Sequence, residues 1–363
     1  MLKILYKIFA GLSAAFLALS GFCSGVADKC DTSADFERYY DAEECCGYNL
    51  DFYGKLKNKT DVNALIIGDS IGEGFSGTGG NMWFQLLEKN IEAEYGVKFT
   101  FRNVSFGGNG TYCGYVSSKI FSDGTDYDLA VLCYGQNDGS PDELKLQYEA
   151  MLRALRTKYD NIAIISILES PQREMTPKMQ VISELCEYYG IPVADTITPF
   201  NTSAIGYENL TTDGCHPNDE GQKIYCEAVM NVIKAELEKS TERYYAMPEP
   251  VNPSVRNYDR FRYLRASEFT RTDDLTYEIG FSFNNAMLGM DYEIQSGENR
   301  IEFYLDGELF HTKTATFNYD FTQRHIVPVC SGANARTSIK IVFMTKQAAD
   351  SFRGLIINPD CAY

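Results

Sequence analysis

The 363-residue sequence is short of histidine and of basic side chains. It has three histidines, and it has 33 Lys and Arg residues against 50 Asp and Glu residues, which gives a net charge of −17 at pH 7. Nucleic acids and anionic membrane surfaces are bound by clustered Lys and Arg, so this balance argues against both as partners. The sequence has no Cys-X-X-Cys pair, so neither a zinc ribbon nor a dithiol redox site has support.

The first 27 residues have the features of an export signal. Lys3 and Lys7 form a positive start, residues 8–19 are apolar, and small residues at 25–27 offer a cleavage site. We therefore predict a signal peptide over residues 1–27 and a secreted or extracytoplasmic protein. The alternative is an uncleaved anchor of about 20 residues, near the length that spans a bilayer. It would be the one contact with a membrane.

Cysteine usage agrees with export. Cleavage after Ala27 removes Cys23 and leaves ten of the 11 cysteines, an even number that favours disulfides in an exported protein. Only Cys330 and Cys361 lie in the C-terminal third, so we predict that they pair if that third folds alone. The other eight allow many pairings, and Cys133, inside an apolar run, is the candidate for a buried free thiol.

Between residues 61 and 240, short apolar runs alternate with amphipathic segments. The strand-like runs are residues 64–67, 98–104, 128–134, 162–168 and 191–194, and the helical segments are residues 82–95, 141–158, 177–189 and 218–239. This alternation predicts an α/β domain with a parallel sheet and helices on both faces. Active sites in such open sheets lie at the carboxyl ends of the strands.

The pattern changes after residue 240. Three prolines fall within or next to residues 241–255, as in a linker between domains. Strand-like runs then follow at residues 275–283, 300–305, 338–345 and 354–357, with turn residues between them. We predict a compact β-sandwich domain over residues 256–363. Residues 28–60 are a Cys-rich lead-in to which the pattern assigns no structure.

A candidate nucleophile ends the first predicted strand, in Gly68-Asp69-Ser70. A serine at a tight strand-to-helix turn is exposed at the edge of the sheet, where a helix N-terminus stabilises developing negative charge. Taken alone, such a triplet is more often a helix cap. The partners of Ser70 therefore decide its interpretation.

A serine nucleophile needs a base, which is nearly always histidine. His216 is the one histidine of the α/β region, because His311 and His325 fall in the predicted β-sandwich. Asp213 precedes His216 by three residues, so a single turn can bring its carboxylate to the imidazole Nδ1. The alternative is a surface loop in which Asp213 caps a turn.

Two further strand ends carry possible donors for an oxyanion. Residues 103–108 (Asn-Val-Ser-Phe-Gly-Gly) offer unobstructed backbone N–H groups, and residues 135–138 (Gly-Gln-Asn-Asp) offer the side-chain amide of Asn137. Each segment alone is ordinary turn chemistry. Together with Ser70 they end three predicted strands of one sheet, and the His216 loop lies beyond them.

These four segments resemble the SGNH (GDSL-type) hydrolase family over about residues 61–239. The four naming residues match Ser70, Gly108 (with Gly107 as the adjacent alternative), Asn137 and His216. The resemblance implies a three-layer α/β/α fold of the flavodoxin type. It also implies an oxyanion hole made of the Ser70 N–H, the Gly108 N–H and the Asn137 amide.

The mechanism that the resemblance implies is double displacement without a metal or cofactor. His216 takes the proton of Ser70, Asp213 stabilises the imidazolium, and water later hydrolyses the acyl-enzyme. Trp83 and Tyr134 are candidates for substrate binding, by stacking on a sugar and by lining an acyl pocket. Core packing is the commoner role of such aromatic residues.

We expect a secreted serine esterase. A carbohydrate esterase that removes acetyl groups from a polysaccharide is the first hypothesis, because an export signal, this site and an attached β-sandwich occur together. An SGNH-type lipase or lysophospholipase, a glycan O-acetyltransferase and a non-catalytic glycan-binding surface protein are the alternatives.

Overall fold

The computed structural model describes residues 51–239, 245 and 247–359. The predicted signal peptide, residues 28–50 of the Cys-rich lead-in and Cys361 lie outside these residues. Within the described part, no helix has the length and hydropathy that a membrane crossing requires. The described residues all fall within one compact unit.

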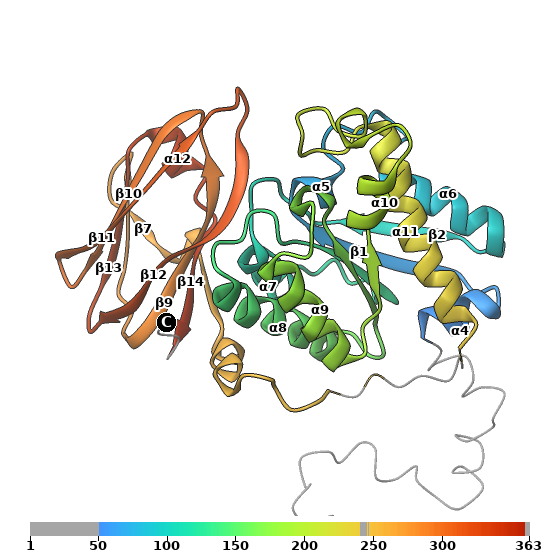
Figure 1. Ribbon diagram of the computed structural model, residues 1–363. Helices are drawn as coiled ribbons and strands as arrows, with labels where there is room; N and C mark the ends of the chain where they lie inside the picture. Colours follow the sequence, from blue (N-terminus) through green and yellow to red (C-terminus); the bar gives the residue numbers. More distant parts are fainter. Residues whose placement is uncertain (1–50, 240–244, 246, 360–363) are drawn as a thin grey trace, which may run out of the picture. The chain divides into compact units, whose positions relative to one another are not determined.

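Five parallel strands form the first sheet, in the order β2-β1-β3-β4-β5 (Figure 1). They are β1 (Val62–Gly68), β2 (Phe99–Asn103), β3 (Leu129–Cys133), β4 (Ala163–Leu168) and β5 (Val193–Asp195). The central strands β3 and β4 are buried at every position, because helices cover both faces of the sheet. A parallel sheet of this kind produces the continuous apolar runs that the sequence shows.

Two separate cores hold the helices to the sheet. One core joins Leu65 and Leu132 to α7, α8 and α9, and the other joins Ile66 and Val131 to α6 and α11. The helices are α4 (Phe52–Lys57), α5 (Ser70–Glu73), α6 (Trp83–Tyr95), α7 (Thr111–Ile120), α8 (Pro141–Lys158), α9 (Pro177–Tyr189), α10 (Ile197–Thr202) and α11 (Asp219–Leu237). The predicted three-layer α/β/α arrangement is confirmed.

Local capping explains why α8 and α9 begin where the sequence predicted. In both, proline occupies the first turn, and the preceding Ser140 or Thr176 accepts a hydrogen bond from the backbone. The sequence did not predict α7 or α10. Lys119 is the one charged residue among the ten of α7, and eight of the ten are buried. The helix therefore lacks the polar face that marks an amphipathic segment.

The C-terminal domain consists of two antiparallel sheets, in the orders β11-β10-β13-β8-β7 and β12-β9-β14-β6. Side chains of both sheets, such as Leu288 and Phe303, meet in a third core, as in a sandwich. The strands are β6 (Arg262–Arg265), β7 (Thr270–Arg271), β8 (Thr276–Ile279), β9 (Phe283–Ile294), β10 (Gly297–Leu305), β11 (Glu308–Phe317), β12 (Gln323–Ala335), β13 (Ile339–Phe343) and β14 (Gly354–Pro359). A five-residue helix, α12 (Lys346–Asp350), lies between β13 and β14.

This β-domain packs directly on the α/β domain. Met287, Ile326 and Ile356 of the second sheet belong to the same core as α7. At Gly289 in β9, an added Cβ would lie 2.2 Å from the hydroxyl of Tyr112, so only glycine allows the two elements to approach this closely. Within the predicted linker, the backbone of Val251 and Asn252 donates hydrogen bonds to Glu149 of α8.

The cysteines in the described part of the chain are free thiols. Five of them, Cys113, Cys133, Cys186, Cys215 and Cys226, lie in the α/β domain, and the sixth is Cys330. Disulfides expected among these five are therefore absent, and Cys133 is a buried thiol as predicted. The expected partner of Cys330, Cys361, lies outside the described residues, so that pairing stays a prediction.

Candidate active site

Ser70 lies at the carboxyl end of β1, where the chain turns at once into α5. Asp69 caps this helix by accepting a hydrogen bond from Ile71 N at 2.9 Å. The turn is tight: a Cβ on Gly68 would lie 2.8 Å from the carbonyl oxygen of Cys133 and 2.9 Å from Gly72 Cα. Glycine at residue 68 is thus what lets the strand end so close to its neighbour and present Ser70 at the edge of the sheet.

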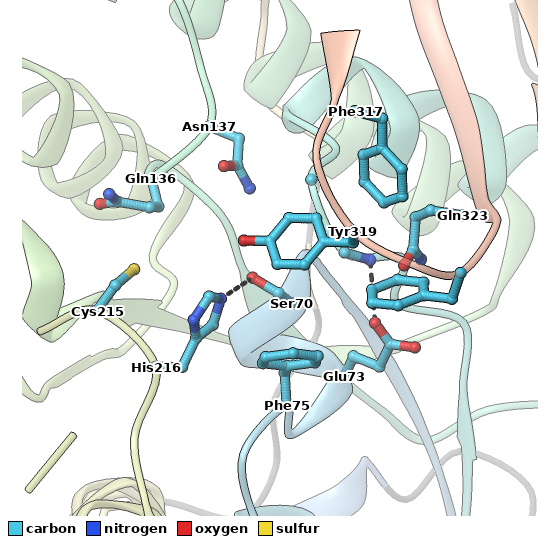
Figure 2. Close-up of a pocket in the computed structure, with 13 residues that line it drawn as sticks. Ser70, Glu73, Phe75, Gln136, Asn137, Cys215, His216, Phe317, Tyr319 and Gln323 are labelled. Carbon is cyan, nitrogen blue, oxygen red and sulfur yellow. Dashed lines mark hydrogen bonds between the residues drawn. The ribbon is translucent and has the colours of Figure 1, made fainter. Parts of the chain in front are cut away.

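A chain of hydrogen bonds links Ser70, His216 and Asp213 (Figure 2 shows the first link). His216 Nε2 lies 3.0 Å from Ser70 Oγ, and His216 Nδ1 lies 2.7 Å from Asp213 Oδ2. The backbone N–H groups of Cys215 and His216 donate to Asp213 Oδ1 at 3.0 and 2.8 Å. The three-residue spacing therefore lets one carboxylate hold both the loop and the imidazole ring.

The network also determines where the imidazole proton resides. An ionised carboxylate only accepts, so Nδ1 of His216 carries the hydrogen and Nε2 has its lone pair toward Ser70 Oγ. Burial raises the pKa of Asp213, but hydrogen bonds from the His216 backbone and ring outweigh it, and the net pKa is lowered. Phe75 packs against the imidazole with ring centroids 4.7 Å apart. The geometry suits a base that removes the serine proton.

The loop after β2 brings Gly107 and Gly108 to the same edge. Gly107 N donates to Glu73 Oε2 at 3.1 Å, so this N–H is already engaged. Gly108 has a positive φ of 69°, a conformation that favours glycine, and it lines the pocket beside Ser70. Of the two glycines that the motif allowed, Gly108 is the one whose N–H has no acceptor among the described residues.

Asn137 follows β3 and lines the same pocket. Its Nδ2 donates to Asp69 Oδ2 at 2.9 Å and to the backbone oxygen of Asn109 at 3.2 Å. These two acceptors determine the orientation of the side-chain amide, because its nitrogen and not its oxygen has to face them. The bond to Asn109 is the longer one, so its hydrogen is the one that can be shared with a negatively charged oxygen above Ser70.

A buried pair of carboxyl groups lies behind these residues. Asp69 and Glu169 are both fully buried, and Glu169 accepts hydrogen bonds from Gln136 N at 2.7 Å and Cys133 Sγ at 3.4 Å. Burial raises the pKa of both groups, and the charge of Glu169 raises that of Asp69 further. Burial and mutual repulsion therefore both oppose ionisation of this pair.

This pair makes stability depend on pH. Burial raises the pKa of Glu169 from 4.5 to about 7. The contribution of Glu169 to the free energy of unfolding is therefore fully present below about pH 4.5, and it is lost as the pH rises through about 7 and the buried group ionises. We expect Glu169→Gln, which cannot lose a proton, to remove this loss. When the pH is raised from about 5 to about 8, the melting temperature of the wild-type protein should fall by a few degrees more than that of Glu169→Gln. Equal slopes, or a matching change in the exposed Glu174→Gln control, would contradict this.

The pocket above Ser70 has a cavity volume of about 140 Å³ and is lined by both domains. The α/β domain supplies Ser70, Glu73, Phe75, Gly107, Gly108, Gln136, Asn137, Cys215 and His216; the β-domain supplies Phe317, Tyr319, Phe321 and Gln323. Figure 2 shows Tyr319 and Phe317 among the side chains that line this pocket together with Ser70. Glu73 is the one carboxylate of this lining, which holds no Lys or Arg.

Two sequence-predicted substrate contacts lie elsewhere. Trp83 is fully buried in the core between α6 and the sheet, and its Nε1 donates to Ile71 O at 3.0 Å. Tyr134 is also fully buried, in the core under α7 and α8. Neither lines the pocket, so stacking of Trp83 on a sugar and an acyl-pocket role for Tyr134 are wrong. The indole N–H is instead satisfied by the backbone of α5, to which Ile71 belongs.

Sequence reasoning missed the residues that shape the pocket. Glu73 stands three residues after Ser70, so a helix starting at Ser70 places both on one face, and this spacing could have indicated it. The aromatic side chains at residues 317–321 carry no such signal, because only the packing of the domains brings them to Ser70. In the described part of the chain, no three His, Cys, Asp or Glu side chains are grouped as metal ligands.

Comparison with known proteins agrees with this architecture. A two-domain esterase (CEX) active on acetylated mannans matches 85% of this chain and 94% of its own, with a TM-score of 0.66 and 14% identity. The structure of such an esterase co-crystallised with mannopentaose matches 89% of this chain and 96% of its own, also at a TM-score of 0.66 and 14% identity. These matches show a shared fold across both domains. A search of curated proteins gave no match.

The family model for the GDSL-like lipase/acylhydrolase family matches residues 66–224. This range includes Ser70, Gly108, Asn137 and His216. Residues 66–224 therefore form a GDSL-like lipase/acylhydrolase domain, as the sequence motifs predicted.

Proposed function

We propose that this protein is a serine esterase in which Ser70 is the nucleophile, His216 the general base and Asp213 the residue that orients the base. The observation that carries the proposal is the hydrogen-bonded chain from Asp213 through His216 to Ser70 at the pocket. As Ser70 Oγ attacks the ester carbonyl, its proton passes to His216 Nε2. The imidazolium then protonates the leaving alcohol, and water repeats the sequence on the acyl-enzyme.

The oxyanion formed by this attack needs preorganised donors. The Ser70 N–H at the start of α5, the Gly108 N–H and Asn137 Nδ2 surround the pocket from three strand ends. Asp69 supports the arrangement from behind, because it accepts from Asn137 and caps α5. Burial raises the pKa of both Asp69 and Glu169, which opposes a full negative charge on this pair behind the site.

We propose a small acyl group, most simply acetyl, on a neutral polysaccharide as the substrate, met outside the cell after export. A cavity of about 140 Å³ has room for a short acyl group. Tyr319 and Phe321 at the pocket mouth are about half exposed, and such rings stack on sugars. Glu73 repels acidic substrates and accepts from hydroxyl groups. The fold also matches an esterase active on acetylated mannans.

Two measurements on the purified chain test this proposal. A fluorophosphonate probe should label Ser70, which peptide mass spectrometry locates, and acetate should be released faster from acetylated neutral polysaccharides than from acetylated polyuronates. Labelling at another residue would contradict the catalytic assignment. Preference for long-chain acyl esters, or equal release from acidic polymers, would contradict the substrate.

Tyr319→Ala separates the substrate from the chemistry. Tyr319 lines the pocket but takes no part in the hydrogen-bonded chain of Asp213, His216 and Ser70, so hydrolysis of a short-chain aryl ester should be retained. Release of acetate from a polysaccharide should fall several-fold, because a stacked ring contributes about 1 kcal/mol. A variant that lost both activities equally would argue against a glycan-binding role for this residue.

A further inference from the structure

One strand of the β-domain runs along the loop that carries Gly108. Ile326 N in β12 donates to Asn109 Oδ1 at 2.8 Å, and Asn109 Nδ2 donates to Arg324 O at 2.8 Å. The side-chain amide of Asn109 therefore pairs with the backbone of β12 through both a donor and an acceptor. Asn109 is fully buried, so water cannot replace these bonds.

The same side chain also holds the loop itself. Asn109 Nδ2 donates to Gly107 O at 2.9 Å and to Phe106 O at 3.1 Å, the carbonyl oxygens of the two residues that precede Gly108. The backbone oxygen of Asn109 accepts from Asn137 Nδ2. One residue of the α/β domain thus connects β12 to two of the three oxyanion donors, the Gly108 N–H and the Asn137 amide.

The side chains of β12 support the loop from the other side. The Arg324 guanidinium lies 4.8 Å above the ring of Phe106 and is held by two hydrogen bonds to the buried carboxylate of Asp291, at 2.9 and 2.7 Å. A Cβ added to Gly108 would lie 3.3 Å from Nε2 of His325. Side chains of the β-domain therefore pack against the loop that carries Gly108.

We propose that β12 of the β-domain positions the oxyanion donors, with Asn109 as the positioning residue that transmits its placement to Gly108 and Asn137. The β-domain then acts on the chemical step in addition to any glycan binding. This inference rests on the proposed esterase activity. It follows from the demand of such donors for fixed geometry, since a misplacement of about 1 Å costs roughly 10²-fold in rate.

The test uses a substrate too small to need the β-domain for binding. With 4-nitrophenyl acetate, Asn109→Ala should lower kcat by about 10- to 100-fold while KM changes less than about threefold. Asn109→Asp keeps the acceptor for Ile326 N but loses the donors to three carbonyls, so it should be equally impaired. It also serves if the alanine variant fails to fold.

Asn358→Ala is the matched control. Asn358 is also fully buried, and it also joins the domains, since its Nδ2 donates to the hydroxyl of Tyr115 at 2.8 Å, but it touches neither the loop nor the pocket. Its kcat should stay within about threefold of wild type. Equal losses in Asn109→Ala and Asn358→Ala would overturn the inference, because weakened domain packing would then explain both. A normal kcat in both Asn109 variants would also overturn it and would leave the esterase proposal intact.

Hydrogen exchange provides a readout that does not depend on turnover. Backbone amides of residues 106–110 should exchange faster in Asn109→Ala than in wild type, and Asn358→Ala should leave this segment unchanged. Unchanged exchange in Asn109→Ala would overturn the inference. If the wild-type protein hydrolyses no ester, the proposed function fails on that result, and exchange still decides whether β12 positions the loop.

Discussion

Replacing Ser70 with Ala is expected to lower kcat for hydrolysis of 4-nitrophenyl acetate by about 10⁴- to 10⁶-fold, and His216→Ala should cost a comparable factor. Ser70 Oγ is the attacking atom, and without the imidazole 3.0 Å away its proton has no acceptor. Because the two groups act as one unit, the double variant should be no slower than either single variant. Steady-state kinetics with the three variants measures this directly.

Matched substitutions separate loss of chemistry from loss of fold. Ser76→Ala removes a nearby half-buried hydroxyl that is hydrogen-bonded to Thr212, and His311→Ala removes a histidine of the β-domain. Both should keep wild-type kcat within about threefold. Multiplicative losses in the Ser70 and His216 double variant would show that the two residues act independently, and residual activity near wild type in Ser70→Ala would exclude Ser70 as the nucleophile.

The parts of the site that the sequence predicted follow local rules. Ser70, Gly108 and Asn137 each come directly after a strand of one parallel sheet, and parallel strands bring their carboxyl ends to a common edge. His216 and Asp213 are three residues apart, so their contact needs only a turn. Apolar runs of four to seven residues likewise located β1, β3 and β4, because both faces of this sheet are covered.

The parts that the sequence did not predict depend on the packing of the two domains. Strand β9 is buried on both faces, since Leu288 packs inside the β-domain while Met287 packs against α7. It therefore lacks the alternation by which strands of a sandwich are recognised. Tyr319 and Asn109 acquire their places only when the domains meet, so no spacing in the sequence relates them to Ser70.

Asn137→Ala is expected to lower kcat by about 10²- to 10³-fold, the usual cost of one lost oxyanion donor. Asn137 Nδ2 donates one hydrogen to Asp69 Oδ2 at 2.9 Å and the other to Asn109 O over the longer distance of 3.2 Å. A tetrahedral oxyanion attracts that hydrogen more strongly than a neutral carbonyl does. The loss should appear in kcat more than in KM, because the charge exists only in the transition state.

Gln136→Ala is the control for this variant. Gln136 is the neighbouring amide in the pocket lining, but its side chain bonds to Gln172 and faces away from the proposed oxyanion, and its backbone N–H still donates to Glu169 after truncation. Its kcat should change less than about fivefold. Asn137→Asp should be at least as slow as Asn137→Ala, because it replaces the donor with a second negative charge beside Asp69. A kcat higher in Asn137→Asp than in Asn137→Ala, or as low in Gln136→Ala as in Asn137→Ala, would contradict Asn137 as an oxyanion donor. Ser70 and Gly108 would then have to bind the oxyanion alone.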